Sequence, residues 1–110
     1  MGADIWLKDK EGRIIKQFRD SYNSTNLLNK LGLSWWLLQD HFEIQEGRMS
    51  PRQAEIFLSL LETHRKGFFE FGEFDQLKEN WQRYYADKYD ELVNLLETAI
   101  DRGLDVIWSV

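Results

Sequence analysis

Few residues in the chain could do acid–base or nucleophilic chemistry. It has two histidines, His41 and His64, and no cysteine. His41 stands between Asp40 and Glu43, either of which could orient it as a proton carrier. A structural role explains His64, because a cation suits the last turn of a helix. No G-x-S-x-G nucleophile motif is present.

Metal and cofactor motifs are missing as well. The sequence has no H-E-x-x-H, no EF-hand loop and no Cys/His spacing typical of a metal site. Its seven glycines stand singly rather than in a phosphate-binding loop. The spacing of its 19 Asp and Glu residues selects no catalytic pair. We therefore expect no metal, no cofactor and, on balance, no enzyme.

An alternative hypothesis is a small-molecule site around the polar loop 20–26. Its Asn23, together with Trp35, Trp36 and His41, could line a small-molecule or small enzyme site. Adjacent positions of a helix point about 100° apart, so we expect one of the two tryptophans to be buried and the other partly exposed. Packing in the core is the better explanation of the tryptophans.

The uneven distribution of charge is the most informative feature. Residues 1–66 hold 10 Lys and Arg against 9 Asp and Glu, whereas residues 67–110 hold 4 against 10. The excess follows helical spacing on one side of the last expected helix, at Asp87, Asp90, Glu91, Glu97 and Asp101. This pattern is typical of a solvated helix face, or of a surface that docks a basic partner.

A phenylalanine-rich connector, residues 68–74, precedes that helix. Phe68, Phe69 and Phe71 alternate with acidic residues that include Glu73. The rings could anchor the connector on the core. One of them could instead stay exposed and extend the docking surface.

Composition excludes several classes of protein. The chain has 110 residues, 43% of them hydrophobic, and a formal net charge of −5. This is typical of one globular domain over residues 1–110. The acidic balance disfavours nucleic-acid binding. No apolar run approaches the roughly 20 residues of a membrane span, and charges occupy the place of a signal-peptide core, so we expect a soluble cytoplasmic protein.

Two hydrophobic runs around Ile5 and Ile14 predict a β-hairpin. Helices are expected over residues 27–31, capped by Ser24 or Thr25, and over residues 34–42. A third helix begins at Ser50 and ends at Gly67, with Ile56 widening its apolar stripe. The last helix spans about 75–102, and residues 104–110 alternate as a strand. Residues 43–49 are expected to form a loop.

The predicted fold class is α+β. The C-terminal strand would join the hairpin, beside the Ile5 or the Ile14 strand, in a three-stranded and mostly antiparallel sheet covered by helices, in the order β-β-α-α-α-α-β. The expected function is a non-catalytic protein-interaction module that docks a basic protein partner or a second copy of itself. A small enzyme or small-molecule binder is the alternative.

Overall fold

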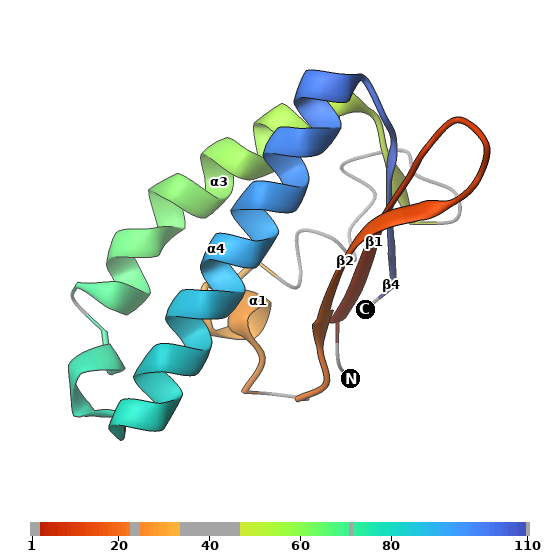
Figure 1. Cartoon of the computed structure of the whole chain (residues 1–110). Helices are drawn as coiled ribbons and strands as arrows, with labels where there is room; N and C mark the ends of the chain where they lie inside the picture. Colours follow the sequence, from red (N-terminus) through yellow and green to blue (C-terminus); the bar gives the residue numbers. More distant parts are fainter. Residues whose placement is uncertain (1–2, 23–24, 34–46, 71, 110) are drawn as a thin grey trace.

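The computed structural model describes residues 3–22, 25–33, 47–70 and 72–109 (Figure 1). The elements in chain order are β1 (Ala3–Lys8), β2 (Ile14–Asp20), α1 (Leu27–Lys30), β3 (Arg48–Met49), α3 (Pro51–Phe69), the 3-10 helix η2 (Phe74–Gln76), α4 (Glu79–Arg102) and β4 (Val106–Ser109). The predicted helix over 34–42 lies outside the described residues. Among the described helices, none has the length and apolar composition needed to cross a membrane.

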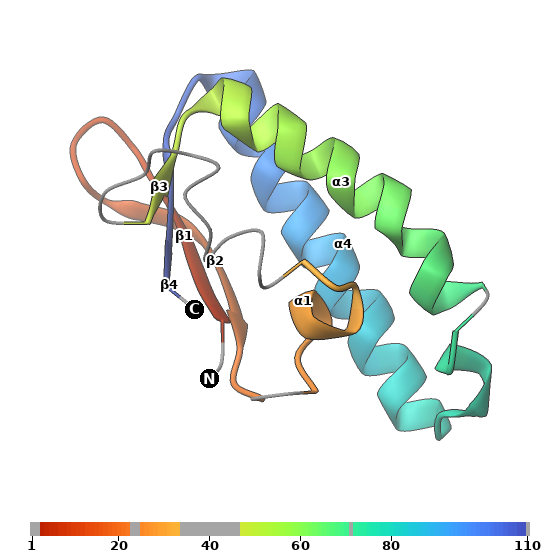
Figure 2. The same cartoon turned by 180° about the vertical axis from the view of Figure 1, so that it is seen from behind.

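The fold is a small antiparallel sheet with helices on one face, which confirms the predicted α+β class (Figures 1 and 2). The strand order is β2-β1-β4-β3, so the sheet has four strands rather than three. The additional strand, β3, lies where a loop was expected and pairs with β4 through Met49 and Val106. Two residues are too few to show the alternation that predicts a strand.

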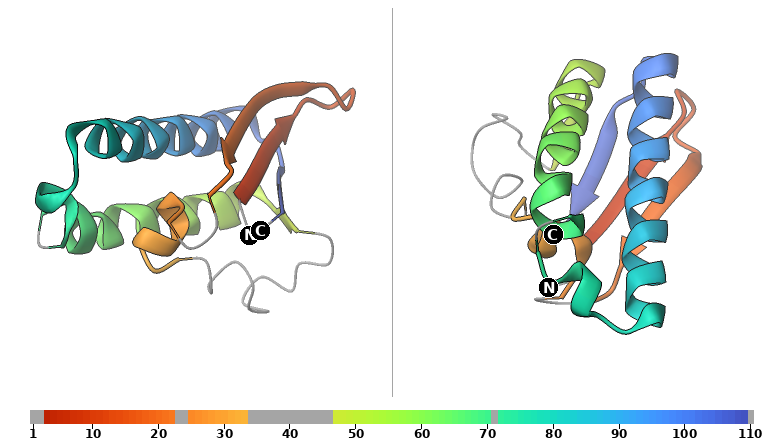
Figure 3. Two further views of the ribbon diagram at one scale, coloured as in Figure 1. Left: turned by 90° about the horizontal axis from the view of Figure 1, so that it is seen from below. Right: turned by 90° about the vertical axis from the view of Figure 1, so that its left-hand side faces the viewer.

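The C-terminal strand takes one of the two positions expected for it. β4 pairs antiparallel with β1, with Trp108 opposite Ile5 and Val106 opposite Leu7. On the other side of β1, Phe18 of β2 also faces Ile5. Because paired residues point to the same side of a sheet, these side chains form one face, on which α3 and α4 pack (Figure 3).

The short helix α1 begins at Leu27, as predicted, but neither predicted residue is its cap. Asn26, rather than Ser24 or Thr25, is the N-cap, and its Oδ1 accepts a 2.9 Å hydrogen bond from Asn29 N. Asn26 also donates from Nδ2 to the Tyr22 carbonyl oxygen. Asn caps helices as well as Ser does, so the cluster of candidate caps left the start uncertain by sequence alone.

Helix α3 begins as predicted and ends later. Ser50 and Gln53 form the expected capping box. The expected end at Gly67 is wrong, because the helix continues to Phe69. Phe68 is only 4% exposed, and its burial offsets the roughly 1 kcal/mol that a helical glycine costs. Ile56 is 49% exposed and does not widen the buried stripe as predicted.

Helix α4 starts later than predicted and ends as predicted. Residues around Asp75 form the separate 3-10 turn η2, and the extended backbone of Leu77 separates it from α4. At the other end Gly103 adopts a left-handed φ of 65°, and Leu104 N donates to Ala99 O. This glycine cap turns the chain from α4 into β4.

Candidate interaction surface

The two faces of α4 divide by residue type. Its inner face carries the buried side chains Tyr85, Leu92, Leu95, Leu96 and Ala99. Its outer face carries the predicted acidic residues, all of them exposed: Asp87, Asp90, Glu91, Glu97 and Asp101. We call these five residues the acidic face. They span 14 positions, or about 21 Å along the helix axis.

The acidic face has few compensating cations. Lys16 Nζ donates to Asn94 Oδ1 at 2.6 Å, and Asn94 stands within one helical turn of Asp90 and Glu91. Glu91 accepts a 3.2 Å ion pair from Lys88. The other four carboxylates make no ion pair or hydrogen bond with a described residue. Like charges stand one turn apart at Asp87 and Glu91, and again at Glu97 and Asp101, so each pair opposes helix stability slightly.

Seven of the 14 basic side chains make an ion pair within the chain. Ion pairs join Arg13 to Asp9 and Glu11, Arg19 to Asp4, Lys30 to Glu73, Arg48 to Asp105, and Arg65 to Glu70. At the hairpin turn the backbone N–H of Arg13 is the main cause that holds the pKa of Asp9 below its ordinary value. The remaining basic side chains make no ion pair with a described residue, so charge of both signs stays partly uncompensated: Lys8, Lys10, Lys16, Arg52, Lys66, Lys78 and Arg102.

The phenylalanine connector packs inward. Phe68 is buried, with its ring edge-on to Tyr85 at a centroid distance of 5.2 Å. Phe69 is half-buried, and Phe71 lies outside the described residues. Glu73 is exposed and pairs with Lys30. The structure thus places Phe68 in the core, where a docked partner has no access to it.

A continuous set of aromatic rings runs along the end of the molecule where α3, η2 and α4 meet. Neighbouring ring centroids in this aromatic band lie 4.9–5.8 Å apart. Its members are Tyr22, Phe68, Phe69, Phe74, Trp81, Tyr84, Tyr85 and Tyr89. Most of these rings contribute to the core, and Tyr22 is the most exposed, at 44%.

A buried carboxylate at the end of β2 supports the band. Asp20 is 1% exposed and accepts hydrogen bonds from Tyr84 Oη at 2.6 Å and from Leu27 N at 2.8 Å. Burial, and then this bond to Asp20, raise the pKa of Tyr84 above its ordinary value. Nothing in the sequence distinguished Asp20 from the other residues of a polar loop, although a carboxylate shortly before a helix start can bond its first N–H groups.

The structure does not test the alternative small-molecule site. Asn23, Trp35, Trp36 and His41 all lie outside the described residues. Asp20 and Asn26, the two ends of the polar loop assigned to that site, are buried and hold α1 in place. In the described parts of the chain, no group of three or more His, Asp or Glu side chains is placed to hold a metal ion.

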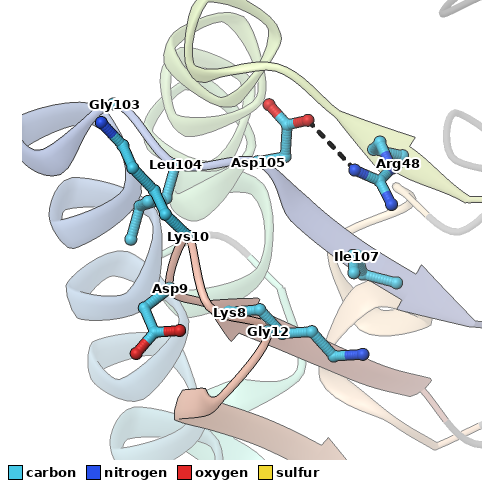
Figure 4. A pocket seen from close by; sticks show the side chains of 9 residues that line it. All are labelled: Lys8, Asp9, Lys10, Gly12, Arg48, Gly103, Leu104, Asp105 and Ile107. Atoms are coloured by element: carbon cyan, nitrogen blue, oxygen red, sulfur yellow. Dashed lines mark hydrogen bonds and ion pairs between the residues drawn. The ribbon is translucent and has the colours of Figure 1, made fainter.

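A hollow of about 370 Å³ lies between the hairpin turn and the start of β4 (Figure 4). Lys8, Lys10 and Arg48 line it, but they do not converge on one point. Lys10 extends toward Gly103 and Lys8 extends to the opposite side, while Arg48 pairs with Asp105 at 3.3 Å. The hollow therefore lacks the convergent donors of an anion site.

Comparisons with protein-family models, with curated proteins and with solved structures give no match. The arrangement of charge and aromatic rings described above is thus the basis for a functional hypothesis.

Proposed function

We propose that this chain is a non-catalytic interaction module whose acidic face docks a protein with a basic surface. One observation carries the proposal: four exposed carboxylates on one side of α4 make no ion pair with any described residue, although Lys16 and Lys88 bind other residues of that side. A lysine or arginine of this chain could pair with these carboxylates at little cost in free energy, because the helix face is exposed. Because the carboxylates are unpaired, cations of a partner would be attracted to them.

Docking onto a second copy has less support. Such docking would need a basic surface on this chain that complements about 21 Å of acidic helix. Arg13, Arg19 and Arg48 each already bind a neighbouring carboxylate. A smaller basic area around the hairpin turn, at Lys8, Lys10 and Arg102, stays unpaired in the described chain. A concentration-dependent rise in mass during sedimentation of the pure protein would favour the second copy over a different partner.

The test begins with a partner captured from the native host and purified. Its association rate with the parent chain is measured at about 0.02 M and 0.5 M salt. Charges at an interface rim act mainly on association, and high salt screens them. We expect the rate to fall steeply with salt, and the Asp90→Lys/Glu91→Lys double variant to associate at least about ten-fold more slowly at low salt.

The matched control is the Glu55→Lys/Glu62→Lys double variant. Both residues are exposed on α3, and the change in net charge is the same. The control should associate as the parent does. A salt-independent rate, or equal slowing of both double variants, would mean that no partner docks on the acidic face.

A further inference from the structure

The chain binds its own cations on the aromatic band, always with a carboxylate beside them. The Arg65 guanidinium lies 5.6 Å from the Phe69 ring centroid and pairs with Glu70. Lys88 Nζ lies 5.7 Å from the Tyr84 ring centroid and pairs with Glu91. Each of these places combines a ring face with an anion, and such a combination attracts a cation more than either group alone.

A third place on the band has two rings with no cation over them. The rings of Tyr22 and Trp81 meet edge to face at 5.1 Å, and Tyr84 touches both. In the described chain, no Lys or Arg lies over Tyr22 or Trp81. Beyond Tyr84, whose ring carries the Lys88 ammonium, Asp87 stands one helical turn further along α4 and is exposed and unpaired.

Hydrogen bonds and ring stacking from the interior fix the three rings of this place. Tyr84 is fixed by its hydrogen bond to Asp20, and Asn26 fixes the Tyr22 backbone by donating to its carbonyl oxygen. Tyr85 stacks on Trp81 from the interior at 5.8 Å and donates to the Thr25 carbonyl oxygen. A pre-formed aromatic surface of this kind loses little side-chain entropy on binding.

We propose that the Tyr22–Trp81 pair is the anchor for one arginine of the docked partner, whose remaining basic residues lie along the acidic face. This inference rests on the proposed function and names the partner's chemistry. The rings touch one another, so the cation binds on their outer surface rather than in a cage between them. Arginine fits best, because its planar and weakly hydrated guanidinium stacks on rings. A basic segment of about seven extended residues would cover the acidic face.

The test uses a hexa-arginine peptide as the probe, titrated into the isolated chain at about 0.02 M salt. Tyr22→Leu removes the exposed ring, and Tyr22→Phe is the matched control that keeps it. We expect Tyr22→Leu to bind the peptide about two- to five-fold more weakly and Tyr22→Phe to bind it as the parent does. The indole N–H resonance of Trp81 should shift on titration in the parent and less in Tyr22→Leu.

The outcomes separate the anchor from the acidic face. If Tyr22→Leu binds like the parent while Asp90→Lys/Glu91→Lys binds weakly, the anchor is wrong and the proposed function stands. If both variants bind like the parent, both ideas fail. Equal weakening of Tyr22→Leu and Tyr22→Phe would also overturn the anchor, because the ring would not be what the peptide contacts. Amide spectra of each variant confirm its fold, and Trp81→Leu replaces Tyr22→Leu if that variant does not fold.

Discussion

The inner and outer faces of α4 are built from one stretch of chain and serve opposite purposes. The inner face is apolar and aromatic, and the one carboxylate beside it, Asp20, has its hydrogen bonds satisfied. The outer face is anionic and largely unpaired. The fold requires the inner face, whereas the charge of the outer face slightly opposes the helix. A feature that the fold does not require is a better candidate for function than one that it does.

The largest expected difference between the faces is in core packing. Leu96→Ala should lower the free energy of unfolding by about 2–5 kcal/mol, because it leaves a cavity in a fully buried position. Urea denaturation followed by circular dichroism measures this. Glu97→Ala, one residue along the helix and exposed, should change stability by less than about 0.5 kcal/mol. Similar losses in the two variants would contradict the division of α4 into two faces.

The hydrogen bond between Tyr84 and Asp20 should matter next. Tyr84→Phe keeps the ring and its contacts but deprives a buried carboxylate of one of the two donors that the described residues supply. We expect a loss of about 1–3 kcal/mol. Tyr89→Phe is the control, because the Tyr89 hydroxyl donates to no described residue, and it should stay within about 0.5 kcal/mol of the parent.

The sequence predicted those parts of the fold that depend on local signals. The Ser50 capping box and the Gly103 cap follow from spacing over a few residues, and the structure confirms them. The pairing of the last strand with the hairpin is long-range, and it was predicted because a lone hairpin needs a third strand. The end predicted at Gly67 was wrong because burial of Phe68 outweighs a local preference. Strand β3 was missed because it exists only through its pairing with β4.

The candidate surface also has one part that local spacing predicts and one part that depends on tertiary packing. Helical periodicity within one segment places the acidic face, so its exposure on α4 could be predicted from spacing alone. Tyr22 and Trp81 meet only because β2, α1 and α4 pack together, and no local pattern joins them. Within the connector 68–74, Phe68 is buried and Phe69 half-buried, because an aromatic ring gains free energy from burial.

A smaller effect concerns pH. Burial and the Asp20 carboxylate raise the pKa of Tyr84, so the folded chain keeps a proton that the unfolded chain releases above its ordinary pKa of about 10. Stability from this group is therefore complete below pH 10 and declines as pH rises above it. Urea titrations at pH 8, 10 and 11 should show this decline, and Tyr84→Phe should reduce it. Burial also raises the pKa of Tyr85 and Tyr89, so part of the decline should persist.

The smallest expected effect is the one that isolates function. Asp90→Lys/Glu91→Lys should leave the free energy of unfolding within about 0.5 kcal/mol of the parent, since both positions are exposed and the Lys88–Glu91 pair is worth little. The new lysine at position 91 would face Asp87 favourably and Lys88 unfavourably, so these small terms nearly cancel. Thermal and urea denaturation at low and high salt check this. A loss above about 2 kcal/mol would mean that the outer face takes part in folding, and slower binding by the same variant would then have a structural cause. With stability unchanged, slower binding can be assigned to the acidic face itself.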